Sequence, residues 1–387
     1  MQFPAATAPT LQRSWTCIGG GNNFSRGSFK AAARSVALDS RGFGAALPTL
    51  CLVGALSFSS SRRRWQHLST GWPPRRHSTS LCRMSTAAAG SGTPAEPRVA
   101  LSEATASVLS EAWRTDAELQ RLTKRPESER LEYNDAEGTQ LFGRVTWPPA
   151  TVTAGPSAKS ADKKYPGVLL LHTAAGPHDL FLHWRADSLA ARGYVVLIAD
   201  CFGDSAGLAW EGSWNQKARE PLRKGASRPL LRERLRAACS TLEQLESVDR
   251  SRLAAVGFCF GGMAALDCVR AGIGGDSLRA VVTFHGILDD APLEVGGGDL
   301  SKGPRILVLN GAEDPFVGSD AVDAFSAQMT SAGARWTMQN YQFAKHGFSN
   351  PAQDLNENPA FGYDAEVAQE SWDYAIQLLD EELAASS

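Results

Sequence analysis

The stretch from Leu253 to Val269, LAAVGFCFGGMAALDCV, constrains the fold more than any other part of the chain. Its first five residues are mostly apolar and predict a buried strand, and the small residues from Gly261 onwards predict a helix. Cys259 stands between them in a G-x-C-x-G pattern. This pattern is typical of a nucleophile elbow, a sharp strand-to-helix turn that lifts a nucleophile above the edge of an α/β sheet. The strand and the helix then approach so closely that Gly257 and Gly261 must lack bulk.

Cys259 has two interpretations. Most free cysteines are small buried hydrophobic residues, and the glycines around this one could mark no more than a strand end. In an elbow, by contrast, the thiol lies at a helix N-terminus, where unpaired N–H groups and the helix dipole favour the thiolate. The backbone N–H of Phe260 is then one donor of an oxyanion hole. The remainder of the chain favours the elbow.

Charge divides the chain into two parts. Residues 1–95 carry ten Arg and one Lys against a single acid, Asp39, whereas residues 96–387 have a net charge of −12. A basic, Ser- and Ala-rich leader with almost no acids is typical of an organelle presequence. We therefore expect residues 1–95 to be a disordered targeting segment for a plastid or a mitochondrion, removed after import. The alternative is a disordered cytosolic tail.

An apolar run at residues 43–58 lies inside this leader. Its sixteen residues include Pro48 and are short for a membrane span, which needs about 20. It could be a signal h-region, part of a bipartite presequence or a weak anchor, and no stable span is expected in the mature protein. The acidic remainder argues against nucleic acid as the main partner.

The cysteines indicate neither a disulfide framework nor a structural metal site. Four remain outside the leader, with no C-x-x-C pair and no zinc-like spacing to histidine. They are Cys201, Cys239, Cys259 and Cys268. This usage favours a reducing compartment.

Strands and helices alternate through most of residues 129–385. A hairpin is expected first, from residues 131–134 and 140–147. Five apolar runs and the strand of the elbow then alternate with helices of 10–20 residues, which predicts a doubly wound, mostly parallel sheet with helices on both faces. The five runs are 168–172, 194–199, 280–284, 306–310 and 336–341. We expect one catalytic domain at 129–385, preceded by a helical extension at 96–128.

Partners for Cys259 are expected at the carboxyl ends of the strands, where the reactive groups of such a sheet gather. Asp314 follows the strand at 306–310, and His346 follows the strand at 336–341. A thiol needs a base to react at neutral pH, and a carboxylate orients that base. The order nucleophile, acid, histidine fits this architecture. Glu313 is a rival for the acid.

The second oxyanion donor is expected after the strand at 168–172. The run from His172 to Gly176 is small enough for its backbone to face a substrate, and we choose the Ala174 N–H. His172 and His285 end strands, and we expect them to be structural rather than the base.

These motifs carry a resemblance. The core from about Tyr165 to Leu379 resembles the dienelactone hydrolase family of α/β-hydrolases. Three pieces match: residues 257–262 (GFCFGG), residues 310–315 (NGAEDP) and residues 346–348 (HGF). The resemblance implies an α/β-hydrolase fold, a Cys259-His346-Asp314 triad, no metal, no organic cofactor and an acyl-cysteine intermediate.

Three positions depart from the bacterial enzymes that open dienelactones. Thr173 stands where those enzymes have a glutamate that helps to deprotonate the cysteine, and Asp204 and Asn350 stand where they use arginines to hold the substrate's carboxylate. Bidentate carboxylate recognition is a role that arginine fills well. The triad therefore carries over from the family, but the substrate does not.

The segment at residues 201–229 is long and rich in Trp, Gly and basic residues, and it is expected to cover the site. We expect Trp210, Trp214 and Thr173 to contact the substrate. One of the arginines here, Arg219, Arg223 or Arg228, could replace the missing anion contacts, although a basic cluster on a loop is more often a solvated surface.

The predicted function is hydrolysis of a small ester or lactone, as a carboxymethylenebutenolidase would do. A thioesterase or acyltransferase on the same triad is one alternative, and a catalytically silent binding protein is another. The protein is expected to be a monomer or a homodimer, with a small-molecule ester, lactone or thioester as its partner.

Overall fold

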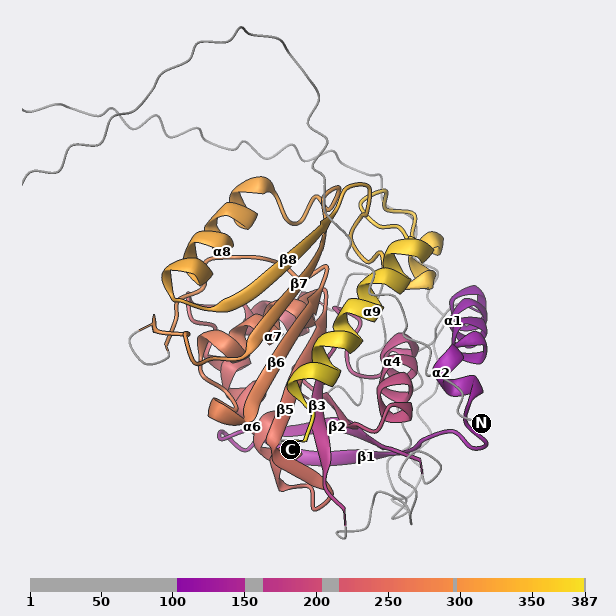
Figure 1. The fold of residues 1–387 in the computed structure, drawn as a ribbon. Coiled ribbons are helices and arrows are strands. Elements are labelled where there is room, and N and C mark those ends of the chain that lie inside the picture. Colours follow the sequence, from indigo (N-terminus) through magenta and orange to yellow (C-terminus); the bar gives the residue numbers. More distant parts are fainter. Residues whose placement is uncertain (1–102, 150–162, 204–215, 295–297, 386–387) are drawn as a thin grey trace, which may run out of the picture. The chain divides into compact units, whose positions relative to one another are not determined.

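An eight-stranded, mostly parallel sheet forms the centre of the structure (Figure 1). The computed structural model describes residues 103–149, 163–203, 216–294 and 298–385. The strand order is β1-β2-β4-β3-β5-β6-β7-β8. β1, β2 and β4 pair antiparallel, and all other neighbours pair in parallel. The strands are β1 (Glu127–Asn134), β2 (Gln140–Trp147), β3 (Tyr165–Leu171), β4 (Val195–Ala199), β5 (Val248–Phe258), β6 (Leu278–Phe284), β7 (Arg305–Gly311) and β8 (Arg335–Tyr341).

The first two strands form the expected hairpin. Asp135 closes its turn, since one carboxylate oxygen accepts two backbone N–H groups at 2.8 and 3.1 Å. β1 begins at Glu127 rather than at Leu131, and Glu127 pairs with Trp147 at the far end of the hairpin. Pairing with β2 thus extends the strand into polar residues that have no apolar pattern of their own.

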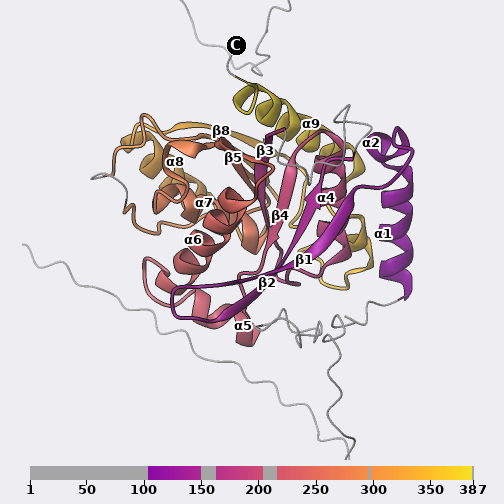
Figure 2. The ribbon, with the colours of Figure 1, turned by 90° about the horizontal axis from the view of Figure 1, so that it is seen from below.

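Helices cover both faces of the sheet (Figure 2). α6, α7 and α8 pack on one face, and α4 and α9 pack on the other. This arrangement confirms the predicted doubly wound sheet. The elements are α4 (Leu180–Ala191), α5 (Gln216–Leu222), α6 (Pro229–Gln244), α7 (Phe260–Arg270), η2 (Gly275–Ser277), α8 (Ser319–Ser331), η4 (Pro351–Leu355) and α9 (Ala365–Glu382).

The apolar strands supply two separate cores. In β3, Leu169 and Leu171 pack with α6 and α7, whereas Val168 and Leu170 pack with α4 and α9. Strands that are buried on both faces need apolar residues at every position. The continuous apolar runs in the sequence follow from this arrangement.

Two short helices precede the sheet and pack on α4. They are α1 (Glu103–Thr115) and α2 (Ala117–Gln120). Asp116 caps α2, and its other carboxylate oxygen accepts hydrogen bonds from Trp184 (2.8 Å) and Ser188 (2.7 Å). Trp113 donates to Asp187 at 3.2 Å. The described part of the expected helical extension is thus attached to α4 by partly buried polar contacts.

Several predictions fall outside the described residues: the leader at 1–95 with its apolar run, Asp204, Trp210 and Trp214. Within the described residues, no helix combines the length and the apolar composition that crossing a bilayer requires.

Candidate active site

Cys259 lies at the sharp turn between β5 and α7 that the sequence predicts. Its backbone has φ +56° and ψ −115°, a conformation that costs a non-glycine residue of the order of 1–3 kcal/mol. A side chain on Gly257 would collide with the backbone of Gly261, and one on Gly261 would collide with the backbone of Leu171. The two glycines are therefore required by the close approach of β3, β5 and α7.

The three side chains expected at separate strand ends meet here. Nε2 of His346 lies 3.0 Å from Sγ of Cys259. Nδ1 of His346 lies 2.6 Å from Oδ2 of Asp314, to which it donates. The exposed fractions of Cys259, Asp314 and His346 are 9%, 3% and 1%. The arrangement joins a thiol, an imidazole and a carboxylate in one buried chain of hydrogen bonds.

The loop after β7 selects Asp314 over its neighbour. Oδ1 of Asp314 accepts the N–H of Phe316 at 2.9 Å, which leaves Oδ2 for His346. The side chain of Glu313 is exposed to solvent. The rival acid is therefore not the one that contacts the imidazole.

His346 is fixed by its backbone and by three rings. Its N–H donates to Ala360 at 3.1 Å, and its C=O accepts the N–H of Gly362 at 3.3 Å. The rings of Phe316, His285 and Phe361 lie 4.9, 5.1 and 5.2 Å from the imidazole, all edge-to-face. Sequence reasoning missed the role of Phe316 and Phe361, because no motif links either ring to His346.

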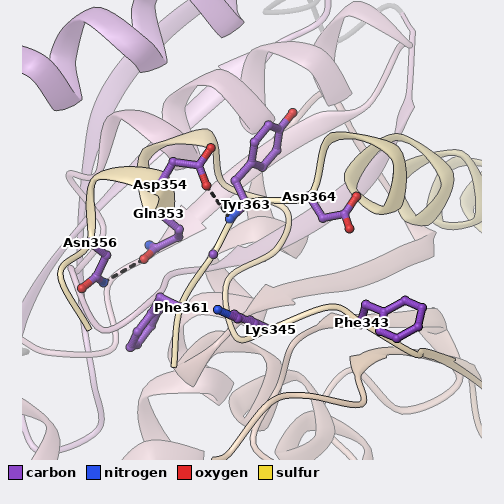
Figure 3. Close-up of a pocket in the computed structure, with 9 residues that line it drawn as sticks. Phe343, Lys345, Gln353, Asp354, Asn356, Phe361, Tyr363 and Asp364 are labelled. Atoms are coloured by element: carbon purple, nitrogen blue, oxygen red, sulfur yellow. Dashed lines mark hydrogen bonds between the residues drawn. The ribbon is translucent and has the colours of Figure 1, made fainter. Parts of the chain in front are cut away.

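Phe361 also lines a pocket of about 320 Å³, drawn in Figure 3. The other lining residues are Phe343, Lys345, Gln353, Asp354, Asn356, Gly362, Tyr363 and Asp364. Cys259, Asp314 and His346 do not line it. The pocket is a neighbour of the triad residues rather than the space into which Cys259 faces.

The surroundings of Cys259 favour its thiolate. Burial alone raises its pKa, but the charge and hydrogen bond of His346 and the backbone N–H groups of Phe260 and Ala174 bring the pKa below the usual value. Burial lowers the pKa of His346, whereas the Cys259 thiolate and the hydrogen bond to Asp314 raise it above its ordinary value. Both shifts act in the same direction and favour a thiolate–imidazolium pair over a neutral thiol and imidazole.

The other described cysteines behave in the opposite way. Burial raises the pKa of Cys239 to about 12 and raises the pKa values of Cys201 and Cys268 still further. Of the four cysteines in the described residues, Cys259 alone has a lowered pKa. This contrast separates a reactive environment from three structural ones.

Both amides predicted as oxyanion donors reach the sulfur. The N–H groups of Phe260 and Ala174 each form a hydrogen bond with the sulfur of Cys259, and both bonds lower its pKa. Thr173 stands beside them, but its hydroxyl is engaged in its own turn. It accepts the Ala175 N–H at 3.1 Å and lies 3.5 Å from Oδ2 of Asp179.

The two histidines expected to be structural make no hydrogen bond with Cys259. Nε2 of His285 lies 2.9 Å from the hydroxyl of Ser349, and His172 contacts the loop that holds Ala174. Both are almost fully buried. The described residues hold no group of three or more His, Cys, Asp or Glu side chains suited to a metal ion.

The sequence pattern favours a solvated surface for the basic residues of the segment at 201–229, and the described residues confirm this only in part. Arg223 and Lys224 are exposed, as on a solvated loop. Arg228 is buried and forms ion pairs with Asp267 and Asp289. Burial lowers the pKa of Arg219 and the charge on Cys259 partly opposes this, so the guanidinium lies within electrostatic range of the sulfur. Asn350 is buried and caps η4.

Comparison with known proteins identifies the family. The model of the dienelactone hydrolase family matches residues 150–383. An uncharacterized protein of Caenorhabditis elegans is 34% identical over 154 residues, which are 40% of this chain and 95% of that protein. The solved structure m3DLH is 33% identical, with a TM-score of 0.58. A dienelactone hydrolase-like promiscuous phosphotriesterase, P91, from metagenomic libraries is 28% identical, also with a TM-score of 0.58.

Each of these two solved structures covers 67% of this chain and is itself covered completely. The family match spans more than half of the chain. The protein is therefore a hydrolase that belongs to the dienelactone hydrolase family and has the α/β-hydrolase fold.

Proposed function

We propose that the protein cleaves a small carboxylic ester or lactone, with Cys259 as nucleophile, His346 as base and acid, and Asp314 as the group that orients His346. One observation carries this proposal. The imidazole lies 3.0 Å from the thiol sulfur and 2.6 Å from the carboxylate through its two different nitrogens. A base held in this way by an acceptor on its far side is the arrangement that activates a nucleophile.

The acylation step follows from this geometry. The Cys259 thiolate attacks the acyl carbon, an S–C bond forms, and the carbonyl electrons move to oxygen. The N–H groups of Phe260 and Ala174 then bind this oxyanion instead of the sulfur. Loss of one such donor typically costs about 10²–10³ in kcat. The C–O bond to the leaving group breaks, and Nε2 of His346 gives its proton to the departing oxygen.

Deacylation reverses these roles. The neutral His346 accepts a proton from water at Nε2 as the water oxygen attacks the thioester carbon. The second tetrahedral intermediate uses the same two amides. The C–S bond then breaks, the carboxylic acid leaves, and the thiolate–imidazolium pair forms again. Asp314 holds the imidazole through Nδ1 in both steps and stabilises the imidazolium.

The substrate is expected to differ from a dienelactone. Thr173 replaces the family's glutamate, and Asn350 replaces one of its two carboxylate-binding arginines. Arg219 lies within electrostatic range of Cys259 and supplies positive charge from a different element, α5. We therefore expect an ester or lactone whose anionic group, if present, is placed differently.

Four other functions are alternatives: three would use the same site, and one would use no catalytic site. A thioesterase or acyltransferase would share the acyl-cysteine intermediate and differ only in leaving group or acceptor. Hydrolysis of phosphotriesters is the activity named for the related structure P91. A silent binding protein would have no use for a thiol with a lowered pKa beside an oriented imidazole, so the site geometry favours an enzyme.

Turnover of a substrate panel tests the proposal. The full chain is assayed with short p-nitrophenyl esters, lactones, acyl thioesters and a phosphotriester, beside Cys259→Ala and Cys259→Ser. We expect carboxylic ester or lactone turnover that falls by about 10⁴-fold or more in Cys259→Ala. Higher activity on thioesters would favour the thioesterase alternative. No turnover of any compound, with Cys259 resistant to iodoacetamide at pH 7, would overturn the enzyme assignment.

Location is a separate proposal. We infer from the +10 charge of residues 1–95 that the protein is imported into a plastid or a mitochondrion and then processed. Fusing residues 1–95 to a fluorescent protein tests this. Organelle fluorescence with a shortened fusion supports import, and diffuse cytosolic fluorescence contradicts it.

Sedimentation of the full chain decides between monomer and homodimer.

A further inference from the structure

His172 lies at the end of β3, between the two expected oxyanion donors, and the proposed chemistry gives it no role. Its side chain is fully buried. The imidazole stacks on the ring of Phe260, with centroids 5.7 Å apart and planes at 24°, and meets the ring of Phe202 edge-on at 4.4 Å. It therefore touches the residue that supplies one donor and directly precedes the loop that supplies the other.

The hydrogen bonds of His172 fix its tautomer. The backbone N–H of Cys201 donates to Nε2 at 3.1 Å, so Nε2 carries the lone pair. Nδ1 must then carry the proton of the neutral ring, and it donates to the carbonyl oxygen of Thr173 at 2.7 Å. Burial lowers the pKa of His172 to about 4, so the ring stays neutral at physiological pH.

The carbonyl of Thr173 belongs to the same peptide unit as the Ala174 N–H. The described residues contain no cis peptide bond. In a planar trans peptide, the C=O and the N–H point in opposite directions. Holding the Thr173 oxygen toward His172 therefore turns the Ala174 N–H away from His172, to the side where it contacts the Cys259 sulfur.

A second donor also holds the carbonyl oxygen of Thr173. The N–H of Gly176 also reaches the Thr173 oxygen, at 3.2 Å, and closes a turn. The Thr173 hydroxyl accepts the Ala175 N–H in the same turn. The turn alone fixes the loop in outline, and the shorter bond from His172 ties the critical peptide to β3 and β4.

We propose that His172 is a positioning residue that orients the Thr173–Ala174 peptide, so that the Ala174 N–H faces the Cys259 sulfur and the developing oxyanion. The role in catalysis rests on the proposed ester hydrolysis. The role in orienting the amide does not, because the sulfur of Cys259 already accepts the same N–H in this structure.

Two variants separate the hydrogen bond from the packing. His172→Leu replaces the imidazole with an apolar side chain of similar size that cannot donate to Thr173. His172→Asn places an amide nitrogen close to the position of Nδ1 and keeps the donor. His172→Gln replaces His172→Leu if the latter does not fold, as judged by circular dichroism and the thermal midpoint. It retains a polar group near Nε2 without a donor at Nδ1.

The first readout needs no turnover. The rate of Cys259 alkylation by iodoacetamide is measured against pH, and its midpoint reports the thiol pKa. Because the hydrogen bond from the Ala174 N–H to the sulfur is weakened, we expect the midpoint of His172→Leu to rise by up to about one pH unit. The midpoint of His172→Asn should stay within about 0.3 units of the wild type.

The second readout is steady-state kinetics with the best substrate of the panel. We expect kcat of His172→Leu to fall about tenfold or more, below the 10²–10³ of a donor lost outright, because Gly176 still holds the carbonyl. KM should change by less than about twofold, since the amide acts on the transition state. His172→Asn should recover most of kcat.

The outcomes distinguish the two proposals. An unchanged midpoint and an unchanged kcat in His172→Leu, with an active wild type, overturn the role of His172 and leave the hydrolase proposal standing. A raised midpoint with no wild-type turnover overturns the hydrolase proposal and leaves the positioning of the amide standing. Equal losses in the Leu and Asn variants assign the effect to packing and overturn the hydrogen-bond mechanism.

Discussion

The two ends of α7 both bury charge, but in different ways. Its N-terminal end carries Cys259, whose partner His346 can give or take a proton. Its C-terminal end carries Asp267 and Arg270, which meet arginines and acids from α6 and the loop after β6. Asp267 accepts two hydrogen bonds from Arg228, at 2.5 and 2.6 Å, and one from Arg232 at 3.2 Å.

The arginines at the C-terminal end keep their charges. Arg228 also binds Asp289 at 2.7 Å, and Arg270 contacts the same carboxylate at 3.2 Å. Arginine is always protonated in proteins, so these basic side chains do not exchange protons near neutral pH. Removing one member of such a network leaves an uncompensated buried charge.

The difference assigns a separate role to each end of one helix. At the N-terminal end, a strained backbone holds a thiol against an imidazole, the pair on which the proposed chemistry depends. At the C-terminal end, fixed ion pairs hold α6, α7 and the loop after β6 together. Substitutions at the two ends should therefore change different quantities.

The largest effect is expected from Asp314→Asn. The amide cannot stabilise the imidazolium and favours the wrong tautomer of His346, so kcat should fall about 10³–10⁴-fold. The free energy of unfolding, in contrast, should change by less than about 1 kcal/mol. Kinetics with the best substrate and urea unfolding check both values. Glu313→Gln is the matched control, and an equal loss in that variant would contradict the assignment of the acid.

Next in size is Asp267→Ala at the other end of α7. Arg228 and Arg232 lose a buried partner, so the free energy of unfolding should fall by about 3–5 kcal/mol. The kcat of the folded fraction should stay within about twofold. Glu381→Gln, which breaks an exposed pair with Arg305, should leave the free energy of unfolding almost unchanged. A large loss of kcat with unchanged stability would show that Asp267 acts on catalysis. It would contradict the separate roles of the two ends of α7.

A smaller effect concerns pH and His172. Its pKa is about 4 in the folded protein and about 6.5 in the unfolded chain. The unfolded chain therefore binds more protons in this window, and the stabilisation is present above pH 6.5 and lost as pH falls. The stability difference between wild type and His172→Asn should shrink by up to about 2 kcal/mol between pH 7 and pH 5.

The wild type is compared with His172→Asn because other groups change the stability with pH in the opposite direction. Burial raises the pKa of Asp179 to about 6 and that of Asp187 to about 7. Their contribution to stability falls as pH rises through the same range, and it cancels in the difference. Urea unfolding at both pH values measures the effect. A difference that grows on acidification contradicts a neutral His172.

The smallest effect is expected from Arg219→Met. If its charge faces the substrate, kcat/KM for an ester with a carboxylate in the acyl group should fall about tenfold relative to a neutral ester of the same size. Arg223→Met is the matched control, because Arg223 is exposed on the same segment. Equal ratios in both variants would place the anion contact elsewhere.

Most of the fold follows from local patterns. The predicted strand at residues 306–310 is β7 (Arg305–Gly311), and the helix expected between it and the next strand is α8 (Ser319–Ser331). Apolar runs of a parallel sheet and helices between them leave few alternatives. The meeting of Cys259, Asp314 and His346 was predictable because parallel strands end at the same edge.

Pairing between distant side chains could not be predicted. Arg228 and Asp267 are 39 residues apart in the chain, and nothing in the basic segment distinguished Arg228 from its exposed neighbours. The tautomer of His172 depends on Cys201, 29 residues away. Such contacts are fixed by the packing of loops, which no periodicity records.

The acyl-cysteine itself gives the most direct test of the central claim. The full chain is mixed with the best ester substrate, quenched in acid within one turnover, digested and examined by mass spectrometry. The account predicts the mass of the acyl group on the peptide that contains Cys259, absent from Cys259→Ala. Turnover without any acyl group on Cys259, or with the acyl group on another residue, would contradict it.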